Sequence, residues 1–139
     1  MNLNFLAIFL GSAFAATGIF AFASSETFFG LLGNYYGAFN NHFVKDAGIA
    51  FLSSGCLILL STKFMEWCVP LTLGGALFIM LHGVFHVQML LVGMAPTTMD
   101  VAKEVLLIIS PSLLTALLLV LRIREYSQNS NGYENKRKL

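Results

Sequence analysis

Long apolar runs, separated by short polar stretches, dominate the pattern of this chain. A helix that crosses a bilayer needs about 20 mostly apolar residues. Four segments meet this requirement, at about residues 3–23, 43–61, 67–93 and 101–121. Inside them, charge is limited to Lys45 and Asp46 in the second segment and to Lys103 and Glu104 in the fourth. The pattern predicts an all-α fold, namely a four-helix transmembrane bundle.

The four spans leave little of the 139 residues for any other domain. A connector of about 20 residues and two short turns are too small to form a separate core. We therefore expect one transmembrane domain over residues 1–126. The polar tail, residues 127–139, is expected to be disordered.

The composition agrees with a membrane location. Hydrophobic residues make up 57% of the chain and charged residues only 11%, whereas soluble domains carry about a quarter charged residues. This excludes a soluble globular enzyme and a disordered protein. The net charge of +1 provides no basic field for phosphates, so no nucleic-acid partner is expected. The expected surroundings are a lipid bilayer.

Basic residues indicate the orientation, because they gather on the cytoplasmic side of membrane proteins. The side that holds the chain termini carries six of them, and the opposite side carries only Lys45 and Lys103. The six are Lys63, Arg122, Arg124, Lys136, Arg137 and Lys138. The sequence thus predicts that both termini are cytoplasmic.

The connector between the first two spans is rich in aromatic residues, including Phe28, Phe29, Tyr35 and Tyr36. Such a segment favours the membrane interface, partly as a short helix. Its simplest role is to anchor the bundle. The alternative is a lid over an outward-facing apolar pocket.

Small residues predict where the helices approach closely. Gly11 and Gly18 lie in the first span, and Gly48 and Gly55 lie in the second. We interpret them as intramolecular contacts, with a homo-oligomer interface as the alternative. Pro111 is expected to kink the fourth helix, because it lacks a backbone donor.

Four ionisable residues form the candidate site. His42 and Asp46 are four residues apart at the outer start of the second span, and His82 and His86 are four apart in the third. Residues at this spacing share a helix face. If the two spans run antiparallel around their short turn, residues of equal depth have numbers that sum to about 128. Asp46 would then meet His82, and His42 would meet His86. Glu104 or Lys103, near the same rim, could complete the network.

Ionisable groups inside a bilayer often mark function, and several interpretations of these four residues stay open. They could clamp two helices together or bind a small apolar ligand with a polar head. They could also hold a metal or haem, because three histidines and one carboxylate are sufficient ligands, or they could conduct protons. No activated nucleophile and no cofactor motif is visible, so enzymatic activity and cofactors stay unassigned.

The run Asn41–Gly48 (Asn-His-Phe-Val-Lys-Asp-Ala-Gly), followed by His82 and His86 in the third span, resembles a known pattern. It is similar to a family of small, uncharacterised bacterial four-helix membrane proteins, loosely DoxX-like in architecture. The resemblance covers about the first two thirds of the chain. It implies a four-helix fold, a bacterial inner membrane location and importance for His42, Asp46, His82 and His86. DoxX-like relatives have been linked to quinone-coupled redox chemistry and to the assembly of partner proteins.

The leading hypothesis is therefore a small membrane protein with an outward-facing polar site between its second and third spans. Asp46 would orient His82 and His86 toward a small ligand. One alternative is an accessory subunit or assembly factor, with a membrane protein or a second copy as its partner. The other is a metal or redox-cofactor site formed by the same four residues.

Overall fold

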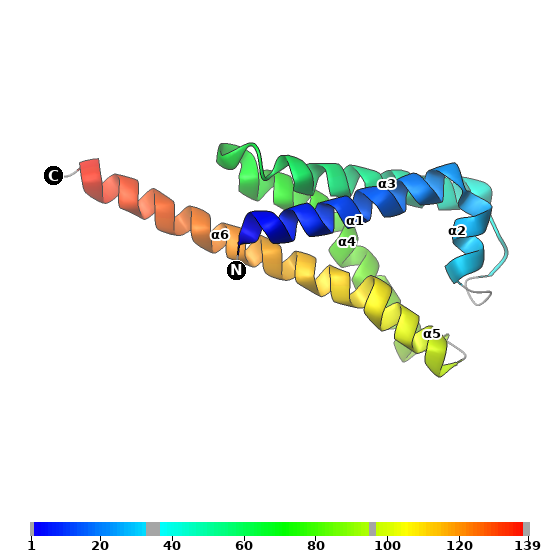
Figure 1. Ribbon diagram of the computed structural model, residues 1–139. Helices are drawn as coiled ribbons and strands as arrows, with labels where there is room; N and C mark the ends of the chain where they lie inside the picture. The colour runs from blue at the N-terminus through cyan, green and yellow to red at the C-terminus, as the bar shows by residue number, and fades with distance from the viewer. Residues whose placement is uncertain (1, 33–36, 95–96, 138–139) are drawn as a thin grey trace.

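The computed structural model describes residues 2–32, 37–94 and 97–137, with side chains described as far as Gln128 (Figure 1). The described residues are mostly helical and contain no strand. In chain order the elements are α1 (Leu3–Ala23), α2 (Ser25–Leu32), α3 (Asn41–Leu60), η2 (Met65–Trp67), α4 (Cys68–Leu91), α5 (Thr98–Lys103), the π-helical turn η3 (Glu104–Ile109) and α6 (Ser110–Arg137).

Four helical segments among the described residues are long and apolar enough to cross a membrane, which confirms the predicted four-span fold. They are Leu3–Ala23, Asn41–Leu60, Met65–Leu91 and Thr98–Gln128. The chain is thus a multi-pass membrane protein. The sequence predicted disorder from Ser127 onward, whereas α6 continues to Arg137. A helix that is already nucleated extends at little cost, and no proline interrupts this stretch.

The aromatic connector begins with α2, the expected short helix. The Ser25 hydroxyl donates a hydrogen bond to Oδ1 of Asn41, 2.6 Å away, which ties α2 to the start of α3. The rings of Phe20 and Phe28 meet edge to face, with centroids 5.6 Å apart. The predicted interfacial residues Tyr35 and Tyr36 lie outside the described residues.

Glycines bring α1 and α3 into close antiparallel contact, and the two helices lie side by side in Figure 1. A Cβ on Gly55 would lie 2.5 Å from the backbone nitrogen of Ala15 and 2.6 Å from the backbone oxygen of Gly11. Gly18 and Gly48 make the same kind of contact about two helical turns further along the two helices. The expected intramolecular use of these small residues is confirmed.

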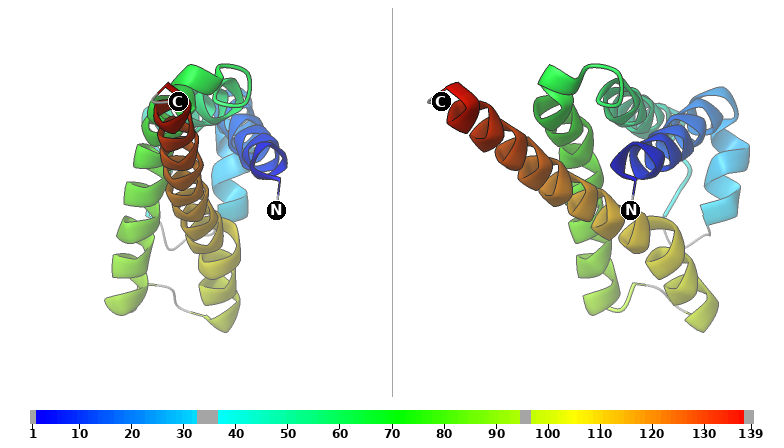
Figure 2. Two further views of the ribbon diagram at one scale, coloured as in Figure 1. Left: turned by 90° about the vertical axis from the view of Figure 1, so that its left-hand side faces the viewer. Right: turned by 60° about the vertical axis from the view of Figure 1, so that its left-hand side comes forward.

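Helix α4 starts beside α3 but does not follow it to its other end. Figure 1 shows α4 crossing behind α1, and Figures 1 and 2 show it running away from α3, where it packs against η3. The buried core lies at the crossing and joins α1, α3, α4 and α6. It consists of Ala7, Leu10, Phe14, Ile58, Ile79 and Leu118.

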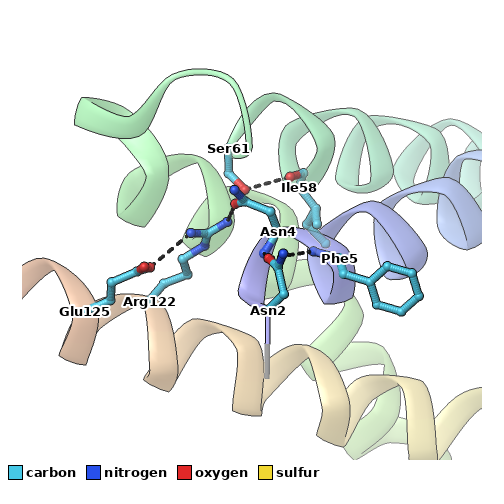
Figure 3. Close-up of polar contacts among 7 residues, drawn as sticks. All are labelled: Asn2, Asn4, Phe5, Ile58, Ser61, Arg122 and Glu125. Atoms are coloured by element: carbon cyan, nitrogen blue, oxygen red, sulfur yellow. Dashed lines mark hydrogen bonds and ion pairs between the residues drawn. The ribbon is translucent and has the colours of Figure 1, made fainter.

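A buried arginine joins α6 to the start of α1, as Figure 3 shows. Arg122 is only 1% exposed. It donates from Nη2 to Oδ1 of Asn4 at 2.5 Å and from Nη1 to Oε2 of Glu125 at 3.1 Å. The sequence interpretation treated Arg122 only as a marker of orientation. Its burial shows that it also fixes how the first and last spans pack.

The glycine contact between α1 and α3 leads to the first prediction. Replacing Gly55 by alanine should lower the free energy of unfolding by about 1–3 kcal/mol, because the new methyl group meets backbone atoms that cannot rotate away. Unfolding of the purified protein in mixed micelles, followed by circular dichroism, measures this change. Gly30→Ala is the matched control, because a Cβ at Gly30 meets no atom within 4 Å. Equal stability of the two variants would contradict the proposed importance of the contact.

Candidate functional site

The two histidines of α4 share one face of the helix, as their spacing predicts. Their ring centroids are 4.4 Å apart, and the ring planes are tilted by 59°. His86 is buried, with 4% of its surface exposed, whereas His82 is half-buried. The two imidazoles therefore touch, but only His82 reaches the surface of the bundle.

A carboxylate from the last span pairs with the buried histidine. Nδ1 of His86 lies 2.5 Å from Oε2 of Glu104. The Glu104 side chain is 1% exposed and that of His86 is 5% exposed, so the pair is shielded from lipid and water. The site thus lies between α4 and η3, at a depth where an isolated charge is costly.

The π-helical turn η3 brings Glu104 into the last membrane-spanning segment. It ends one residue before Ser110, whose backbone N–H and hydroxyl both donate to the Val105 carbonyl, the hydroxyl at 2.7 Å. Pro111 follows and has no N–H to continue an α-helical ladder. A wider turn before a proline accommodates this missing donor. The α-helical hydrogen-bonding pattern before Pro111 is therefore replaced by a π turn, with Glu104 as its first residue, and the expected kink at Pro111 stays a prediction.

Close packing of α4 on α6 holds the pair together. A Cβ on Gly83, between the two histidines in sequence, would lie 2.5 Å from Cβ and Oγ of Ser112. The Ser112 hydroxyl lies 3.0 Å from the Ile79 carbonyl of α4 and 2.7 Å from the Ile108 carbonyl of its own chain segment. Gly83 is thus needed for the approach that sets Glu104 beside His86.

An aromatic ladder surrounds the second histidine. Phe78 stacks on His82 with centroids 5.5 Å apart, and Phe51 of α3 meets both rings edge to face at 5.2 Å. Phe14 of α1 continues the ladder at 6.3 Å from Phe51. No hydrogen bond joins a ring nitrogen of His82 to another described residue. His82 is therefore a polar ring in an apolar aromatic setting.

The structure places the other two candidate residues elsewhere. Nδ1 of His42 lies 2.9 Å from Oδ2 of Asp46, on a face of α3 where their side chains are 86% and 61% exposed. The expected pairing of Asp46 with His82 is replaced by the pairing of Glu104 with His86. Pairing of Asp46 with His82 requires α3 and α4 to stay adjacent along their whole length, but α4 leaves α3 beyond the contact between Phe51 and His82 (Figure 1).

The four candidates therefore do not form one ligand set. Among the residues that the structure describes, no group of three or more His, Cys, Asp or Glu side chains has the geometry to hold a metal ion. The residue that completes the α4 site is Glu104. It was visible in the sequence as one of the few charged residues within an apolar span.

The chemistry of the pair follows from its burial. When Nδ1–H of His86 donates to a Glu104 carboxylate, Nε2 of His86 is left as an acceptor. The two side chains together then carry one negative charge. When one more proton is bound, the two side chains are neutral overall, either as an ion pair or as two neutral groups.

Comparisons of the chain with protein-family models, with curated proteins and with solved structures find no match. The similarity to DoxX-like proteins thus stays a prediction from the sequence, and the function is argued from the site itself.

The buried pair leads to the second prediction. Glu104→Leu should lower the free energy of unfolding by about 3–5 kcal/mol, because it removes one partner of a buried pair. The double variant His86→Phe with Glu104→Leu should be more stable than Glu104→Leu alone, since neither polar partner is then left buried. Unfolding in mixed micelles measures all three proteins.

The exposed pair on α3 supplies the control. Asp46→Leu should change the free energy of unfolding by less than about 1 kcal/mol, as is usual for exposed ion pairs. Comparable losses from Asp46→Leu and Glu104→Leu would contradict the assignment of Glu104, rather than Asp46, as the buried partner.

Proposed function

We propose that this multi-pass membrane protein binds a small lipid-soluble molecule, and that His82 is the hydrogen-bond partner of its polar head. The observation that carries the proposal is the environment of His82. It is half-buried in an apolar span and has no hydrogen bond to a described residue. An imidazole whose nitrogens lack a hydrogen-bond partner among the described residues is costly in such surroundings. A ligand with a hydroxyl or ammonium head would supply the partner.

The neighbours of His82 support an aromatic body for this ligand. Phe51 and Phe78 flank the imidazole. Phe85, on the same helix, is 55% exposed and packs edge to face on His86. Aromatic rings prefer stacked or edge-to-face neighbours at such distances. A ring carrying a short chain with a polar head would therefore fit against this face of α4.

The buried pair of His86 and Glu104 supports a binding site whose side chains keep one orientation. Because Glu104 engages Nδ1 of His86, the ring of His86 is oriented, and His82 packs against it. The polar head of the ligand would thus meet the imidazole of His82, which is held in place by the rings of Phe51, Phe78 and His86.

We also infer the membrane setting from the distribution of basic residues. Both termini would be cytoplasmic, in a bacterial inner membrane, and the α4 site would lie in the outer half of the bilayer. A lipid-soluble ligand would then reach His82 sideways from the outer leaflet. This orientation rests on the sequence pattern alone.

A neutral probe tests the proposed binding. We expect 4-phenylbutan-1-ol to bind the purified protein in micelles saturably, with the hydroxyl donating to His82. His82→Phe keeps the aromatic ladder but removes the acceptor, so affinity should fall about tenfold, the equivalent of one hydrogen bond of about 1.4 kcal/mol. Isothermal titration calorimetry measures the affinity, and the NMR signals of ¹⁵N-labelled histidine show which ring is affected.

His42→Phe is the matched control, because it makes the same substitution at an exposed histidine outside the site. It should leave the affinity for the probe unchanged. Absence of saturable binding, or equal affinity of the unsubstituted protein and His82→Phe, would overturn the proposal.

A further inference from the structure

We propose that two copies of this protein pair in the membrane through one face of α3, which we call the α3 stripe. Its members are all exposed: His42, Asp46, Ile49, Ser53, Cys56 and Leu60. The inference goes beyond the proposed function and does not rest on it, because the stripe contains no residue of the site around His82.

The spacing of the stripe is that of a helix that packs along a second helix. Its residues follow one another at alternating intervals of four and three, which is the heptad spacing of the contact positions in a coiled coil. They cover about 80° of the helix circumference. After Phe43, every exposed residue of α3 belongs to the stripe. Residues that pack against α1 and α4, such as Gly55 and Ile58, lie on the opposite side of α3.

The composition of the stripe differs from that of a surface that faces lipid. Exposed positions of α4 include Leu73, Leu77 and Leu81, as expected for contact with acyl chains. Four of the six residues of the stripe are instead polar or small: His42, Asp46, Ser53 and Cys56. Ser53 lies in the middle of α3, away from the headgroups at either end of the helix. Such side chains are enriched where membrane helices meet, so the stripe favours a helix over lipid as its neighbour.

Charge complementarity identifies this helix as α3 of a second copy. Two copies in one bilayer have the same orientation, so their α3 helices run parallel and a two-fold axis makes the contact reciprocal. In a parallel pair at this spacing, the side chain of His42 enters a hole that includes Asp46 of the second copy. Within one copy, Nδ1 of His42 lies 2.9 Å from Oδ2 of Asp46. When the imidazole is charged, its Nε2–H can donate to the carboxylate of the second copy.

The remaining residues continue this contact across the span. From His42 to Leu60 the stripe is about 27 Å long, close to the thickness of about 30 Å of the hydrocarbon core. Ile49 and Leu60 supply apolar layers, and the small side chains of Ser53 and Cys56 let the two backbones approach. The contact is distinct from the glycine contact between α1 and α3, so both can form in the same protein.

Cys56 provides a test in the unsubstituted protein, because the two-fold axis brings its two copies into one layer, within reach of a disulfide. The other cysteine, Cys68, is buried. In vesicles of phosphatidylethanolamine and phosphatidylglycerol, oxidation by copper phenanthroline should give dimers linked through Cys56. Non-reducing electrophoresis and mass spectrometry of the linked peptides measure them. The matched control combines Cys56→Ser with Leu73→Cys, which moves the exposed thiol to α4. It should give at most about a tenth of the cross-linked product.

Two charge variants test the complementarity. His42→Asp and Asp46→Lys each place like charges opposite one another in a pair of identical chains. We expect each variant to raise the dimer dissociation constant at least tenfold, measured by sedimentation equilibrium in micelles. The double variant should restore the dimer, and so should an equimolar mixture of the two single variants. Both positions are exposed within one copy, so the circular dichroism spectrum should keep its helical signal.

The possible results separate this inference from its alternatives. A monomer at every ratio of protein to detergent, with cross-linking no greater than in the Leu73→Cys control, would overturn it and leave the stripe to lipid or to a different membrane protein. A dimer that does not cross-link through Cys56 would place the contact on another face and also overturn it. Failure of both the double variant and the mixture to restore the dimer would contradict the pairing of His42 with Asp46. None of these results bears on binding at His82.

Discussion

The hydrogen bond between His86 and Glu104 is the interaction on which the arrangement of the second half of the chain depends. A carboxylate that is 1% exposed inside a membrane span is tolerated only beside a partner or a proton. That requirement fixes the depth of η3 against α4. It also explains why α4 and α6 approach as closely as the missing side chain of Gly83 allows. The π turn before Pro111 gives the backbone the path that places Glu104 against α4.

Two kinds of helix packing coexist in the bundle. Helices α1 and α3 pack through glycines and apolar surface. The stability of this contact depends on shape complementarity and not on the protonation of a side chain. The contact between α4 and the last span adds a buried ionisable pair to the same kind of close approach. The two halves meet in the shared core, at the bond between Arg122 and Asn4, and where Phe51 of α3 touches Phe78 and His82.

Hydropathy was sufficient to predict the spans, because each must match the thickness of a bilayer. The first span, Leu3–Ala23, agrees with the prediction at both ends. The close contacts of these glycines were also predictable, because small residues are enriched where membrane helices approach closely and glycine gives no advantage at a position that faces lipid. The glycines are Gly11, Gly18, Gly48 and Gly55. The partner of His86 was not predictable in the same way. It depends on where α4 leaves α3, which is set by packing between residues far apart in sequence, and hydropathy contains no such information.

The separation of His82 from Glu104 has a functional consequence. A ligand that touched the carboxylate directly would have to open the buried pair and displace His86. Because His82 is half-buried whereas His86 is buried, a ligand could reach His82 while the pair stays closed. Under the proposed function, binding at His82 would leave the hydrogen bond between His86 and Glu104 intact.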